Sequence, residues 1–166
     1  MSIKRKVDFE YVVADILSNE KFKSLNNELH HGITRYEHSI RVARYTYCIA
    51  KTFRMNKCVE TTRAALLHDF YNDKELGDET STQRLSSHPF VASQNAYKYF
   101  NIDNFQKDII EAHMFPVTKK LPKTKESILV SLMDKVAAVY EIGNYKLALK
   151  LSMALIFIYN ILTIER

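Results

Sequence analysis

One short run constrains this chain more than any other, an apolar segment that ends in a histidine and an aspartate, Ala64–Asp69. Its alanines and leucines indicate a buried helix, yet neither His68 nor Asp69 suits an apolar interior, because a buried carboxylate is costly without a partner. A divalent metal fits both, with an imidazole nitrogen and a carboxylate oxygen as ligands. The alternative is a helix that simply ends at a polar pair, with His68 capping its last carbonyls.

The rest of the chain favours long helices. Only three glycines and three prolines occur in 166 residues, too few for the many tight turns of a β-sandwich or barrel. Helical spacing of apolar residues and capping signals predict helices at 7–18, 36–53, 59–68, 88–100, 105–114, 125–140 and 146–165. We therefore expect one all-α domain over residues 1–166, a bundle of about seven helices.

The longest polar stretch, residues 70–87, has no clean periodicity and is predicted to be a loop. Long loops in compact domains are often functional, so this stretch is a candidate lid, with an ordinary surface loop as the alternative. The following helix is expected to begin at His88, with Ser87 as its N-cap and Pro89 in its first turn.

The last predicted helix, 146–165, contains a charge-free run from Leu151 to Ile164. This run is short for spanning a bilayer. We expect a buried helix that packs on the domain, with membrane association through it as the alternative.

Charge and cysteine content bear on partners and compartment. The net charge is +5, but the basic residues are scattered, so we expect no stable nucleic-acid complex, and a mildly basic enzyme that acts on small phosphorylated molecules explains the charge equally well. Two cysteines exclude a disulfide framework. The basic start, residues 1–6, lacks the apolar region of a secretory signal, and we expect a cytoplasmic protein. The oligomeric state is not indicated.

Further metal-ligand candidates lie far from His68 and Asp69 in the sequence. His38 falls on the apolar face of its predicted helix, and His88 and His113 fall at predicted helix ends. Asp134 lies inside the apolar run 129–139 and needs a strong partner there. A salt bridge from Asp134 to Lys135 or Arg63 is the simpler alternative.

The order H…HD…H…H…D resembles the HD-domain superfamily of metal-dependent phosphohydrolases over about residues 34–141. The segments that carry the resemblance are Arg35–Ala43, Ala64–Asp69, Ser87–Pro89, Glu111–His113 and Met133–Lys135. The resemblance implies that His38, His68, Asp69 and Asp134 hold one metal. It also implies that His88 and His113 hold a second metal, with Asp69 bridging the two.

The resemblance further implies hydrolysis of a phosphoester or phosphoanhydride bond in a nucleotide-like small molecule by a metal-bridging hydroxide. The chain looks most like the small HDIG-type hydrolases, including the branch that cleaves diadenosine tetraphosphate symmetrically, although Phe70 and Tyr71 replace the Ile-Gly of that motif. Iron or manganese suits the ligand set, and magnesium, cobalt and nickel are compatible with it. The rivals are a dinuclear-iron oxygenase on the same scaffold and a non-catalytic nucleotide-binding regulator.

Residues near the predicted ligands are candidates for catalysis and substrate binding. Arg35 and Arg41 lie within one turn of His38 and are predicted to grip phosphate and stabilise developing charge. Asp73 is the candidate general acid, with simple surface solvation as the alternative. Lys119 and Lys120 are predicted to add positive potential at the pocket mouth, unless they belong to a solvated loop.

Overall fold

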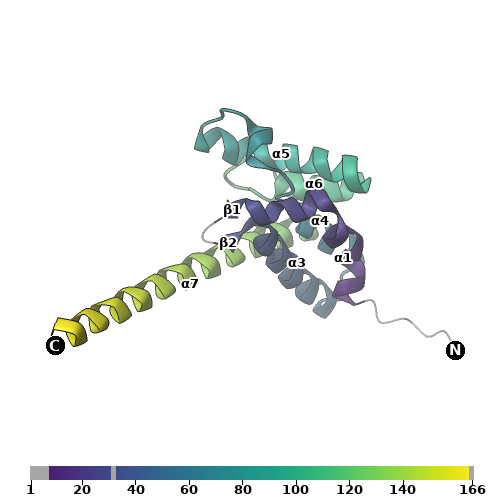
Figure 1. The fold of residues 1–166 in the computed structure, drawn as a ribbon. Coiled ribbons are helices and arrows are strands. Elements are labelled where there is room, and N and C mark those ends of the chain that lie inside the picture. Colours follow the sequence, from purple (N-terminus) through teal and green to yellow (C-terminus); the bar gives the residue numbers. More distant parts are fainter. Residues whose placement is uncertain (1–7, 31–32, 165–166) are drawn as a thin grey trace.

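The computed structural model describes residues 8–30 and 33–164, and these form seven α-helices, two short 3-10 helices and one two-stranded ladder (Figure 1). Residues 1–7, which include the basic start, and residues 165–166 lie outside the described part. The elements are α1 (Phe9–Ser18), α2 (Glu20–Lys23), η1 (Ser24–Asn27), β1 (Leu29–His30), β2 (Ile33–Thr34), α3 (Arg35–Thr52), α4 (Cys58–Leu67), η2 (Asp73–Leu76), α5 (Ser81–Phe100), α6 (Asn104–Ala112) and α7 (Lys125–Ile164). The all-α class predicted from the sequence is confirmed, with β1 and β2 as a minor antiparallel addition.

Helices α3 and α4 form the centre of the domain. Helix α3 starts with a capping box in which Thr34 and Glu37 satisfy each other's backbone N–H groups. Helix α4 buries its last residues completely, Ala64 to Leu67. Helix α1 is fixed to α4 by Arg63, whose guanidinium contacts both carboxylate oxygens of Asp15 at 2.6 and 2.7 Å. This packing holds the end of α4, and with it His68 and Asp69, inside the domain.

The prediction of a loop over residues 70–87 is wrong for residues 81–87, which belong to α5. This helix begins at Ser81, with Thr80 and Gln83 forming a capping box, and Pro89 lies inside the helix rather than in its first turn. Residues Asp73–Leu76 form η2, so the candidate lid is not one continuous loop. Side-chain capping by Thr80 outweighed the weak helix propensity of the polar residues that follow it, and this T-x-x-Q signal was present in the sequence.

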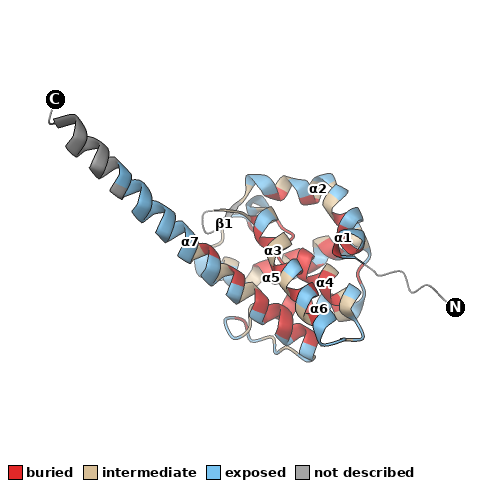
Figure 2. Cartoon of the chain, turned by 90° about the horizontal axis from the view of Figure 1, so that it is seen from below, coloured by how far each residue is buried: buried red, intermediate tan, exposed pale blue. Residues whose placement is uncertain are grey.

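The prediction of two separate helices near the end of the chain is also wrong. The two helices expected at 125–140 and 146–165 are one continuous helix, because Gly143 in a helix interior costs only about 1 kcal/mol relative to alanine and does not end it. The second half of α7 extends away from the domain (Figures 1 and 2). The described side chains from Asn144 to Leu155 are exposed, so over this range the expected packing on the domain is wrong. The helix was predicted to be buried because it is apolar, but no described segment reaches it.

Within the described residues, no helix is both long enough and apolar enough to cross a membrane.

Candidate metal centre

Five segments of the fold bring the six predicted metal ligands together. His38 comes from the second turn of α3, and His68 and Asp69 directly follow α4. His88 lies in α5, His113 directly follows α6, and Asp134 lies in α7. All six are buried or nearly so. Residues separated by up to 96 positions thus meet in the domain interior.

Each of the four imidazole rings is held by its Nδ1 atom. His68 Nδ1 lies 2.8 Å from the carbonyl of Ala65, His88 Nδ1 2.8 Å from that of Arg84, and His113 Nδ1 2.7 Å from that of Ile110. His38 Nδ1 lies 2.9 Å from a carboxylate oxygen of Glu141. Because these partners are acceptors, each Nδ1 carries a proton, and a ring held in this way presents the lone pair of Nε2 when it is neutral. Metal-binding histidines are oriented in this way.

The four Nε2 atoms converge on two carboxylates. Asp134 Oδ1 lies 3.1 Å from His38 Nε2 and 3.5 Å from His68 Nε2. Asp69 divides its oxygens, with Oδ2 3.6 Å from His68 Nε2 and Oδ1 3.3 Å from His88 Nε2 and 3.6 Å from His113 Nε2. Two overlapping triads have the spacing of a metal site, His38–His68–Asp134 and His68–Asp69–His113.

The donor atoms at this centre need a cation. His88 Nε2 and His113 Nε2 are 3.2 Å apart, although both rings already use their Nδ1 proton elsewhere. Two lone pairs at that distance require either an extra proton or a positive ion between them. His68 Nε2 and Asp69 Oδ1 are buried without a hydrogen-bond partner, and such groups are costly unless an ion satisfies them. The residues therefore fit a divalent metal.

The electrostatics of the site agree with this requirement. Burial lowers the pKa of His38, but hydrogen bonds to Asp134 and Glu141 outweigh burial and raise that pKa to about 10. Burial, together with His68 and His88, lowers the pKa of His113 to about 3. Burial raises the pKa of Asp69, but the neighbouring His68 and His88 outweigh burial and hold it well below its usual value. The carboxylates stay ionised, and positive charge is drawn to the centre.

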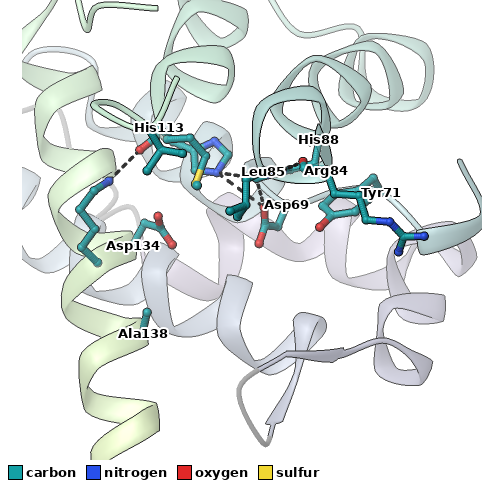
Figure 3. A pocket seen from close by; sticks show the side chains of 11 residues that line it. Asp69, Tyr71, Arg84, Leu85, His88, His113, Asp134 and Ala138 are labelled. Atoms are coloured by element: carbon teal, nitrogen blue, oxygen red, sulfur yellow. Dashed lines mark hydrogen bonds and ion pairs between the residues drawn. The ribbon is translucent and has the colours of Figure 1, made fainter. Parts of the chain in front are cut away.

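A cavity of about 270 Å³ opens above the centre (Figure 3). Asp69, His88, His113 and Asp134 line it on one side, whereas His38 and His68 lie fully buried. Its remaining walls are Tyr71, Arg84, Leu85, Met114, Val117, Lys135 and Ala138. The metal-ligand candidates thus meet a space that a small molecule can enter.

Four residues around the centre were not predicted from the sequence. Glu141 orients His38, and Lys135 donates to the carbonyl of His113 at 3.0 Å and to Ser131 Oγ at 2.9 Å. Tyr71 lies against His88 with ring centroids 5.2 Å apart, and Arg84 lines the cavity. Glu141 was detectable, because it lies seven residues, or two helical turns, after Asp134 and so on the same face of α7.

The structure places neither Arg35, predicted to bind phosphate, nor Asp73, predicted as general acid, in the cavity lining. Arg35 is buried, and its guanidinium contacts Asp73 Oδ1 at 2.9 Å and the carbonyl of Tyr71 at 2.9 Å. The guanidinium therefore lies buried in these contacts and not at the cavity where a phosphate would bind. Asp73 pairs with Arg35, is half exposed and does not line the cavity, and its role as general acid stays a prediction. The pair fastens the chain after Asp69 to α3.

The other predicted substrate-binding residues also lie outside the cavity lining. Arg41 forms an ion pair with Glu141 and does not line the cavity. Lys120 forms ion pairs with Glu111 and Asp108, and Lys119 is exposed outside the cavity lining. Arg41 lies one turn from His38, but its side chain pairs with Glu141 of α7, which sequence spacing alone does not reveal. The alternative proposed for Asp134 fails as well, because Arg63 pairs with Asp15 and Lys135 with backbone and Ser131.

The structure is thus an all-helical domain that gathers histidines and aspartates from five segments into a candidate metal centre under an open cavity. The family model described as HD domain matches residues 35–139, and the chain belongs to the HD-domain family. Comparison with curated proteins finds no match, and comparison with solved structures finds none. HD domains are generally metal-dependent phosphohydrolases, and the matched region contains all six candidate ligands.

Proposed function

We propose that this protein is a metal-dependent phosphohydrolase that cleaves a phosphoester or phosphoanhydride bond in a small, nucleotide-like molecule. The observation that carries the proposal is the set of four Nε2 atoms, each fixed through its Nδ1, that face two ionised carboxylates beside a cavity. Phosphate esters are anionic, and catalysis of their hydrolysis depends on neutralising that charge.

We further propose two divalent ions per chain, iron or manganese, because mixed imidazole and carboxylate ligands suit these metals. His38, His68, Asp69 and Asp134 would hold one ion, and His88 and His113 the other. Asp69 would bridge, and the support for this is that its two oxygens face different histidines. When bound, such a metal pair neutralises phosphate charge and acidifies water.

The protein's own contribution is to position and enclose the substrate. The Lys135 ammonium is held by His113 and Ser131 on the cavity wall, where it adds positive charge beside the ligands. Leu85, Met114 and Val117 give the wall an apolar character suited to the organic part of the substrate. The cavity of about 270 Å³ lies near the lower limit of roughly 300 Å³ for small-molecule sites, which favours a small substrate or one that extends beyond the mouth.

The test is to purify the full chain anaerobically, measure metal per chain, and screen mononucleotides and dinucleoside polyphosphates for release of phosphate or nucleotide with added manganese. We expect about two metals per chain and hydrolysis without oxygen. A His88→Ala variant should retain about one metal, whereas Lys119→Ala, a change at an exposed position outside the cavity, should retain two. Turnover only with oxygen would favour the oxygenase, and bound metal without any turnover would favour the regulator.

A further inference from the structure

An exposed face of α7 carries an apolar stripe, whose member Tyr140 also lies beside α3, with the Arg41 guanidinium 5.2 Å from its ring centroid. Most members of the stripe lie three or four residues apart, and all fall within an arc of about 120° around the helix. The large ones are between 43% and 72% exposed. The stripe consists of Leu132, Val136, Val139, Tyr140, Gly143, Leu147 and Leu151. It lies roughly 130° around the helix axis from the buried positions Val130, Asp134, Ala137 and Glu141, so a partner can approach it without contacting the domain core.

The stripe is self-complementary when two copies of α7 run antiparallel. A two-fold axis at the peptide bond between residues 141 and 142 pairs Leu132 with Leu151, Val136 with Leu147, and Tyr140 with Gly143. A two-fold interface requires this property, because the same surface must serve both partners. The spacing of four residues forms the ridges by which helices cross and interdigitate.

Gly143 supports a partner at this point. A Cβ added to Gly143 would meet nothing within 4 Å, so the folded chain itself does not require glycine there. Glycine in a helix interior nevertheless costs stability relative to alanine. In the antiparallel pair, Gly143 lies opposite the Tyr140 ring of the second copy, where the missing side chain lets the two helices approach closely.

From these observations we infer that the protein self-associates as an antiparallel dimer through the outer face of α7, centred on Gly143. The stripe residues at about half exposure would bury on the order of 600 Å² per chain, near the ~800 Å² per partner of a standard interface. No stripe residue lines the cavity above the metal centre. The inference is therefore independent of the proposed catalytic function.

The first test measures mass in solution by sedimentation equilibrium of the full chain between 1 and 100 µM, a range that covers dissociation constants on the order of micromolar. We expect a dimer, and we expect Leu147→Lys to raise its dissociation constant at least 100-fold. Leu149→Lys is the matched control, because Leu149 is 50% exposed and Leu147 56%, on the same helix but on different faces. It should change the constant less than threefold. A wild-type monomer at 100 µM, or equal effects of both variants, would overturn the inference.

Two further measurements address register and the competing partner. In a Cys48→Ser/Cys58→Ser background, which removes the two native thiols, a Val136→Cys/Leu147→Cys double variant should form disulfide-linked dimers under mild oxidation, whereas each single variant should not, because an antiparallel pair does not bring like positions together. Efficient cross-linking of the single variants would overturn the antiparallel arrangement. Sedimentation with phosphatidylcholine–phosphatidylglycerol vesicles tests the lipid alternative. Binding to vesicles by a chain that is monomeric without them would overturn the dimer.

Discussion

The two halves of α7 are both rich in apolar residues but have opposite surroundings. From Glu126 to Glu141 the helix buries one face against α3, α4 and α6 and brings Asp134 into the metal centre. From Asn144 to Leu155 the described side chains are exposed, leucines included (Figure 2). An apolar helical sequence therefore predicts a helix in both halves, but burial depends on whether other segments of the fold reach it. The following predictions test this contrast, from the largest expected effect to the smallest.

The largest effect is expected in the buried half at Asp134. Asp134→Asn removes a charged oxygen that faces both His38 and His68. Given the proposed function, loss of metal-dependent stabilisation of several kcal/mol should lower kcat/KM by on the order of 10³-fold. Hydrolysis assays and metal analysis of the purified variant provide the measurement. Lys150→Gln in the projecting half should leave both quantities unchanged, and an equal loss in the two variants would contradict the contrast.

A matched pair of truncations compares the halves directly. Leu129→Ala removes a buried side chain and should lower the free energy of unfolding by about 2–5 kcal/mol. Leu147→Ala makes the same chemical change at an exposed position and should cost less than about 0.5 kcal/mol to the monomer. Urea denaturation at a protein concentration below that of self-association measures both. Similar costs for the two variants would show that the projecting half is packed on the domain.

The third prediction concerns Glu141, at the boundary between the halves. Its carboxylate orients His38 and pairs with Arg41. Glu141→Gln should weaken metal binding by about 10- to 100-fold, because an outer partner fixes the ring orientation and basicity of a ligand histidine. Competition titration with a metal indicator gives the affinity. If Arg41→Met weakens metal binding as strongly, the role of Glu141 is to anchor Arg41 rather than to orient His38.

The smallest effect is expected on acidification at Asp15, far from α7. The hydrogen bonds from Arg63 lower the pKa of Asp15 below its usual value, so this pair stabilises the fold above about pH 4 and loses that contribution as the pH falls through the lowered pKa. The pair is partly exposed and should contribute less than about 1 kcal/mol. Thermal denaturation of wild type and Asp15→Asn should therefore differ at pH 7 and converge near pH 2. A difference that persists at pH 2 would point to packing instead of charge.

All six metal-ligand candidates were predictable because each lies where its chemistry conflicts with its surroundings. Asp134 in an apolar run and His68 with Asp69 at the end of an apolar helix need partners wherever the chain folds. Their convergence follows from the family pattern. In the structure, each of the six has a side-chain atom within 3.6 Å of another member of the set.

Residues whose roles depend on side-chain direction were not predictable in the same way. Arg35 and Arg41 were expected to bind substrate because they are near His38 in the sequence, but each is neutralised by a carboxylate more than 30 positions away. Lys135 was considered only as a salt-bridge partner, yet it is the lysine that lines the cavity. Sequence spacing gives the face of a helix, whereas ion pairs between distant segments decide which charges remain free.

The anchored imidazoles have a consequence for the order of assembly. The four rings are fixed through their Nδ1 atoms by protein acceptors, three of them backbone carbonyls. Folding of the polypeptide can therefore precede loading, the reverse of a zinc finger, which is unfolded until its metal binds. A chelated sample should keep its helical circular dichroism and recover its metals on simple addition, with a gain in melting temperature that grows with metal concentration.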